Sequence, residues 1–221
     1  MHVSDGLLSG AVITAGFVGT AILTAATLRK MELEEIPKIS VATSVFFVAS
    51  LIHIPVGPSS VHLLLNGLVG IILGWRAFPA ILLGIILQAI LFGHGGVTVI
   101  GVNSVMLGGG ALVAFGIWQL RHKFSFSKNE VIFGGLAGAS ATIASGLILS
   151  AALITTGEEF TVTAGIVLAY HIPVMIIEGL VAGACVGFLL KTKPEVLSGF
   201  RYSSHHPSIN KSAATSDSSK D

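Results

Sequence analysis

Charge is scarce in this sequence: only 10% of its 221 residues are Asp, Glu, Lys or Arg, while 52% are hydrophobic. An average soluble domain has about 25% charged residues, which it needs to cover its surface. A soluble fold of this composition would leave much of that surface apolar, so we predict an integral membrane protein. The formal net charge is only +1 and there is no strongly basic arm, which argues against a nucleic-acid partner.

Cysteine and the common catalytic motifs are also lacking. The single cysteine, Cys185, excludes an internal disulfide and offers no thiolate cluster for zinc. The sequence contains no GxxxxGK[ST], so the chain does not hydrolyse ATP through a P-loop, and it has neither HExxH nor GxSxG. No Lys or Arg precedes the first apolar run, so we expect no signal peptide and a mature chain that begins at Met1. We therefore expect a protein that is not an enzyme and needs no organic cofactor.

Seven apolar stretches approach the roughly 20 residues that a spanning helix needs. They are residues 6–28, 39–54, 61–75, 78–92, 97–120, 131–156 and 162–190. The third and fourth are only about 15 residues long, so they are either short spans or include a re-entrant segment. We predict an all-α, multi-pass protein with seven transmembrane helices in a membrane domain of residues 1–190. Residues 191–221 are polar and are expected to form a disordered cytoplasmic tail.

The basic residues predict how the chain crosses the membrane. All 12 Lys and Arg residues fall between spans one and two, three and four, five and six, or after span seven, and the alternate segments have none. Because cytoplasmic segments are enriched in Lys and Arg, we expect the N-terminus outside and the C-terminus in the cytoplasm of a prokaryotic cell.

Histidines concentrate on the side that this orientation places outside. Five of the eight map there, namely His2, His53, His62, His94 and His171. Acidic residues but no basic ones share that face, so it should attract cations.

The first two residues form a potential chelate. The amine of Met1, the backbone nitrogen of His2 and the His2 ring nitrogen Nδ1 can close a five-membered and a six-membered ring on one ion. Nitrogen-rich sites of this kind suit Ni(II) or Cu(II), and Co(II) is more flexible. A second imidazole would complete four nitrogens. The alternative is that Met-His occurs here by chance.

Two outer segments could supply further groups. Residues 53–62 contain two prolines and a glycine, which predict a tight loop before His62 begins the next span. His62 is then either a ligand or a partner of a loop carbonyl, as is His53, and Ser60 could cap the helix. His94 lies among three glycines ahead of Asn103, where it is more plausibly an outer-shell hydrogen-bonding group than a ligand.

The last span contains His171 and Glu178, seven residues apart and hence on one helix face. A carboxyl group at mid-span is costly in lipid, so Glu178 should face the bundle interior. It serves either as a structural hydrogen-bonding group or as part of a proton or ion path.

Several motifs together resemble the CbiM/NikM family, the substrate-binding components of cobalt and nickel energy-coupling-factor transporters. They are residues 1–8 (MHVSDGLL), 59–64 (SSVHLL), 88–96 (QAILFGHGG) with 101–103 (GVN), and 171–174 (HIPV) with 178–179 (EG). Ser4 departs from the residue usual in that family. The resemblance implies a seven-helix fold whose N-terminal segment plugs the outer cavity. It also implies that metal is held by the Met1 amine, the His2 amide and ring nitrogens, and the His62 ring.

The resemblance further implies partners: a transmembrane coupling subunit, two cytosolic ATPase subunits and often a small accessory membrane subunit. The metal, Co²⁺ or Ni²⁺, would be the transported substrate, and the sequence does not choose between them. Two other hypotheses remain open at this point. One is a stand-alone, proton-coupled metal permease that uses Glu178, and the other is a vitamin-binding relative, which the aromatic content of 7% disfavours.

Overall fold

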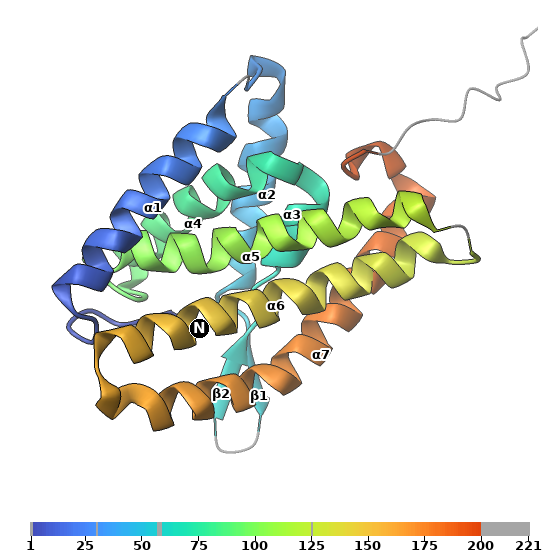
Figure 1. Cartoon of the computed structure of the whole chain (residues 1–221). Coiled ribbons are helices and arrows are strands. Elements are labelled where there is room, and N and C mark those ends of the chain that lie inside the picture. The colour runs from blue at the N-terminus through green and yellow to red at the C-terminus, as the bar shows by residue number, and fades with distance from the viewer. Residues whose placement is uncertain (1, 30, 57–58, 125, 200–221) are drawn as a thin grey trace, which may run out of the picture.

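The computed structural model shows a bundle of helices with one short β-hairpin (Figure 1). It describes residues 2–29, 31–56, 59–124 and 126–199, and for residues 53–56 and 59–62 it describes the backbone only. The α-helices are α1 (Gly10–Leu28), α2 (Ile36–Ala49), α3 (Asn66–Leu73), α4 (Ala77–Phe92), α5 (Ile100–Leu120), α6 (Asn129–Thr156) and α7 (Thr161–Thr192). The strands are β1 (His53–Val56) and β2 (Ser59–His62), and the 3-10 turns are η1 (Leu33–Glu35), η2 (Gly74–Arg76), η3 (Arg121–Lys123), η4 (Glu158–Phe160) and η5 (Pro194–Val196).

Five of the described stretches are long and apolar enough to cross a membrane. They are Gly10–Leu28, Asn66–Phe92, Ile100–Lys123, Asn129–Thr156 and Glu158–Thr192. The second of these joins the third and fourth apolar stretches of the sequence into one run through η2. Helix α2 has 14 residues and α3 has 8, so each is shorter than the roughly 20 residues of a straight span. The chain is therefore a helical multi-pass membrane protein, and its count of seven crossings stays a prediction.

Small residues bring the long helices together. Helices α6 and α7 run side by side along most of their length (Figure 1). A Cβ on Gly138 would lie 2.6 Å from the Cβ of Ala182 and 2.8 Å from the carbonyl oxygen of Glu178, which leaves room only for hydrogen. Such close backbone approach is how helices pack where lipid removes the hydrophobic drive to associate.

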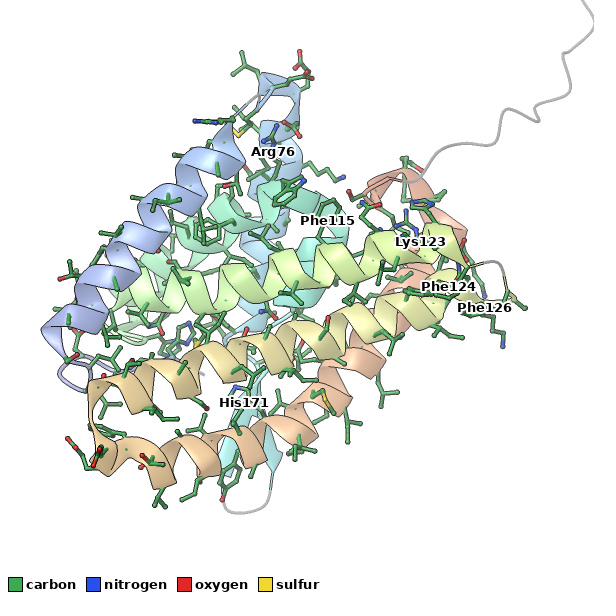
Figure 2. The ribbon with its side chains drawn as sticks, in the orientation of Figure 1. Arg76, Phe115, Lys123, Phe124, Phe126 and His171 are labelled. Atoms are coloured by element: carbon green, nitrogen blue, oxygen red, sulfur yellow. The ribbon has the colours of Figure 1, made fainter. Side chains whose placement is uncertain are left out.

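One end of the bundle gathers basic residues. Arg76, between α3 and α4, forms an ion pair with Glu35 at 2.9 Å and donates hydrogen bonds to the carbonyls of Thr27 and Arg29, which ties the start of α4 to the end of α1. Trp75 of the same turn meets Phe115 near the end of α5, with 5.8 Å between ring centroids. Two of the junctions that the sequence analysis assigned to the cytoplasm, those that contain Arg29 and Arg76, are thus neighbours in space. Figure 2 shows Lys123, in a third junction, farther from Arg76.

The C-terminal segment joins this end as well. The carbonyl of Ser198 accepts hydrogen bonds from Trp118 and Arg121, and Leu197 is buried. The chain is therefore packed against the bundle well past residue 190, where the disordered tail was expected to begin. Residues 200–221 lie outside the described part.

Residues 53–62 form a hairpin where the sequence predicted a loop and the start of a span. Strands β1 and β2 pair antiparallel, with His53 opposite His62 and Pro55 opposite Ser60. The expectation that His62 begins the next helix is wrong, because His62 ends β2 and α3 begins at Asn66. Ser60, inside β2, does not cap that helix; its N-cap is Leu65, in a left-handed conformation.

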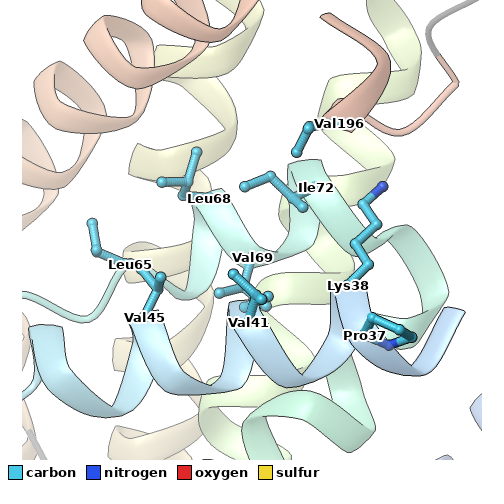
Figure 3. A pocket seen from close by; sticks show the side chains of 10 residues that line it. Pro37, Lys38, Val41, Val45, Leu65, Leu68, Val69, Ile72 and Val196 are labelled. Carbon is cyan, nitrogen blue, oxygen red and sulfur yellow. The ribbon is translucent and has the colours of Figure 1, made fainter. Parts of the chain in front are cut away.

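A groove of about 350 Å³ runs between α2 and α3 (Figure 3). Val45 and Leu65 line one end of the groove, and Pro37 and Lys38 line the other. Its lining is almost wholly apolar apart from Lys38, which suits contact with lipid chains better than contact with water.

Candidate metal centre

The N-terminal segment is held inside the bundle by an asparagine clamp. Asn103, near the start of α5, accepts a hydrogen bond from the Val3 amide at 2.9 Å and donates one to the Val3 carbonyl at 3.1 Å. Both residues are buried, with 3% of Val3 and 1% of Asn103 exposed. The Asn103 side chain bonds both the amide and the carbonyl of Val3, as a neighbouring β-strand would. Because Val3 is next to His2, these bonds also fix the position of His2.

Asp5 forms a second attachment, to the loop between α4 and α5. Its carboxylate accepts hydrogen bonds from the backbone amide of Thr98 at 3.1 Å and from the Thr98 hydroxyl at 2.6 Å. The Asp5 amide donates to the carbonyl of Gly95 at 2.7 Å. The expectation that the N-terminal segment docks into the protein is therefore met for residues 2–5.

Two glycines allow this loop to close on the segment. Gly95 and Gly96 have φ values of +78° and +102°, which side chains rarely adopt. A Cβ at Gly95 would lie 2.6 Å from the Asn103 amide nitrogen, and one at Gly96 would overlap the Asp5 carboxylate. The α4–α5 loop therefore lies close against the N-terminal segment and Asn103, with room only for glycine at these two positions.

We expect Gly96→Ala to undock the N-terminal segment, because both the backbone angle and the Asp5 contact oppose a methyl group. The stability cost should be at least about 1 kcal/mol, the scale of a residue forced into a sparsely populated conformation. Cleavage of residues 1–9 by a protease in nanodiscs would measure it, with Gly10→Ala as the matched control since no atom lies within 4 Å of a Cβ there. Equal protection of the two variants would contradict the assignment.

His2 lies against His94 and Gln88. The rings of His2 and His94 stack with 6.2 Å between centroids. Burial lowers the pKa of His2 to about 3, aided by the charges of the N-terminal amine and His94, while a hydrogen bond with the Gln88 side chain acts in the opposite direction. At neutral pH the His2 imidazole is therefore uncharged, which is the form that binds metal ions.

Glu178 supports the chain that follows His62. Its carboxylate accepts hydrogen bonds from the backbone amides of Leu64 and Leu65, the latter at 3.1 and 3.3 Å. Glu178 is 2% exposed, as expected for a carboxyl group turned into the bundle. These bonds favour the structural role among the two considered for it, and they hold the chain non-helical just before α3.

His171 shares the buried face of α7 with Glu178, as the spacing of seven predicted. Its Nδ1–H donates to the carbonyl of Val167 at 2.7 Å, and Gly146 of α6 leaves space for the ring. Figure 2 shows His171 between α6 and α7, well away from Lys123 at the basic end.

Four of the predicted site residues lie wholly or partly outside the described part of the chain. Met1 lies outside the described residues, and the side chains of His53, Ser60 and His62 do as well. Val3 and Leu64, which follow the two proposed ligand positions, both belong to a large buried hydrophobic cluster that extends over several helices. Among the residues that the structure describes, no three His, Cys, Asp or Glu side chains form a metal cluster.

Sequence reasoning missed the partners of this region. Gln88 donates to the Ser50 hydroxyl at 2.8 Å, and Thr98 binds Asp5. The sequence does show an amide side chain, Gln88, within the apolar stretch 78–92, and a buried amide needs hydrogen-bond partners. This pattern could have indicated that Gln88 bonds to another polar group. Nothing in the sequence identifies Ser50, which lies 38 residues away.

Comparisons with known proteins agree along the chain. Residues 2–196 match the family model described as "Cobalt uptake substrate-specific transmembrane region", CbiM. The chain is 35% identical over 199 residues to the "Putative metal transport protein" of Haemophilus influenzae, covering 89% of this chain and 97% of the relative. It is 30% identical over 171 residues to the "Fused nickel transport protein NikMN" of Rhodobacter capsulatus, covering 73% of this chain and 47% of that protein.

The fold also matches a solved structure. A crystal structure of a transition metal transporter superposes with a TM-score of 0.69, covers 86% of this chain and 93% of its own, and is 22% identical in sequence. Identity at this level supports a shared fold.

Proposed function

The chain belongs to the CbiM family of cobalt uptake transmembrane proteins, and from that premise we propose that it is the metal-capturing subunit of an energy-coupling-factor transporter for cobalt or nickel. The family is one of transporter components and not of enzymes. The observation that carries the proposal is the clamp of Asn103 on Val3, because it holds the residue next to His2 buried against α5.

We propose that the metal is the substrate and is bound by Met1, His2 and His62. The Met1 amine with the His2 amide and ring nitrogens would supply three donors, and the His62 ring would supply the fourth. Three features support this set: the neutral His2 imidazole, the buried segment around it, and the shared cluster of Val3 and Leu64. His53, Ser60, His94, Asn103, His171 and Glu178 would act around the site rather than as ligands.

The proposal includes seven crossings with the N-terminus outside. The junctions that contain Arg76 and Arg121 would then face the cytoplasm, where membrane proteins carry an excess of basic residues. The docked N-terminal segment and the α4–α5 loop would face outward, where metal arrives.

Release would require the N-terminal segment to leave its place. It is attached by the Asn103–Val3 and Asp5–Thr98 hydrogen bonds, each with a net value of about 0.5–1.5 kcal/mol, or up to about 3 kcal/mol for those to a charged group. A small number of such bonds can be broken reversibly by a conformational change that ATP hydrolysis drives in partner subunits. We propose as partners a transmembrane coupling subunit, two cytosolic ATPases and a small accessory membrane subunit.

Reconstitution tests this function. Liposomes with the chain and its partner subunits should accumulate ⁵⁷Co²⁺ or ⁶³Ni²⁺ only when ATP is present on the ATPase side. Liposomes with the chain alone should bind metal but not accumulate it, with or without a pH gradient. Uptake by the chain alone, driven by a pH gradient, would instead establish the stand-alone permease.

A further inference from the structure

Gln88 is a polar side chain enclosed by apolar helices. It lies in the last turns of α4 and is 0% exposed. Its amide nitrogen donates to the hydroxyl of Ser50 at 2.8 Å, and that hydroxyl donates to the carbonyl of Phe47 at 2.7 Å. Because the Ser50 hydroxyl donates its single proton to Phe47, it can only accept from Gln88. The Gln88 nitrogen therefore faces Ser50, and the Gln88 oxygen Oε1 faces the other way.

The Oε1 atom of Gln88 needs a donor. It is buried from water, and a buried amide oxygen without a hydrogen bond costs roughly 1–3 kcal/mol. The side chain of His2 interacts with that of Gln88, and the His2 atom Nε2 is buried as well. The backbone confirms the proximity, because the carbonyl of Gln88 accepts from the amide of His94, whose ring stacks on His2.

The chelate proposed above requires one tautomer of His2. A six-membered ring closes only through Nδ1, because Nε2 lies on the far side of the imidazole. A neutral imidazole carries one proton, so Nδ1 is open to a metal when that proton is on Nε2. A hydrogen bond to the second ring nitrogen is the usual device that sets this choice in metal sites.

We propose that Gln88, oriented by Ser50, is a positioning residue that accepts the Nε2–H of His2 and so holds Nδ1 ready for the metal. The effect on metal affinity rests on the proposed function, but the predicted His2 tautomer exists before any metal binds. It gives Ser50 a role in metal affinity that acts through Gln88.

Side-chain ¹⁵N NMR of His2 in the metal-free protein tests the inference directly. The wild type should show the Nε2–H tautomer. Gln88→Leu removes the acceptor and should raise the Nδ1–H population of His2. Ser50→Ala should raise it in part, because without Ser50 the Gln88 amide can rotate and exchange its oxygen and nitrogen. Gln88→Glu keeps an oxygen at this position and should retain the wild-type tautomer. Ser150→Ala is the matched control for Ser50, since Ser150 is buried and its hydroxyl donates to the carbonyl of Ala164.

Nickel titration of the same proteins gives the second readout. Loss of such an outer-shell partner typically weakens metal binding about 10- to 100-fold, which we expect for Gln88→Leu but not for Gln88→Glu or Ser150→Ala. An unchanged His2 tautomer in a folded Gln88→Leu or Ser50→Ala protein would overturn the inference. A wild type that shows the Nε2–H tautomer but binds neither nickel nor cobalt would overturn the proposed function and leave the tautomer assignment standing.

Discussion

Extending the chain in front of Met1 should abolish tight metal binding while leaving the protein folded. An extension converts the Met1 amine into a peptide amide, which has no basic lone pair, and it adds chain next to His2 and the buried Val3. Loss of an outer-shell partner alone costs about 10- to 100-fold in affinity, so loss of a ligand should exceed 100-fold.

The design of the extension matters. A single added residue would place His2 third, and a histidine in third position can close a four-nitrogen chelate with a free amine on its own. We therefore specify a glycine extension that puts His2 beyond the third position and ends in a protease site immediately before Met1. Competition with a chelator would measure nickel affinity before and after cleavage, and affinity should return when Met1 is freed. The same affinity in both forms would exclude the amine as a ligand.

The sequence predicts much of this fold because lipid imposes simple requirements. Apolar stretches of sufficient length predicted the long helices α1 and α5 to α7, while the orientation that the alternation of basic residues predicts stays a prediction. Both signals are local in the chain, and each follows from the cost of placing charge or unpaired backbone in hydrocarbon.

The hairpin was not predictable in the same way. The prolines and glycine of residues 53–62 indicate a turn, but they do not decide whether the flanking residues pair as strands. Glu178 contributes to that decision by bonding the amides of Leu64 and Leu65 from another helix. Its partner lies 114 residues away, and no spacing rule connects them.

The same reasoning applies to the candidate site. Met1-His2 could be recognised as a chelate from chemistry alone, and Asn103 could be grouped with His94 from their proximity in the chain. That Asn103 clamps the backbone of Val3, and that Ser50 orients Gln88, depends on tertiary packing. Residues that bind directly are therefore easier to predict than those that hold them in place.

Glu178→Leu should destabilise the protein strongly and weaken metal binding with it. The substitution leaves the buried amides of Leu64 and Leu65 without an acceptor, and each such group costs about 1–3 kcal/mol. Because His62 lies two residues before Leu64, release of this segment should also displace the proposed ligand. Thermal unfolding in nanodiscs and nickel titration would measure the two effects.

Glu178→Gln separates anchoring from proton transfer. Glutamine keeps a carbonyl oxygen that can accept from Leu65 or Leu64, so an anchor should be weakened but retained, and ATP-driven uptake by the reconstituted transporter should persist. A proton path through this position needs a group that ionises, and glutamine cannot replace it. Full loss of uptake in a Glu178→Gln protein of normal stability and metal affinity would therefore contradict the anchor and assign Glu178 to the transport step itself.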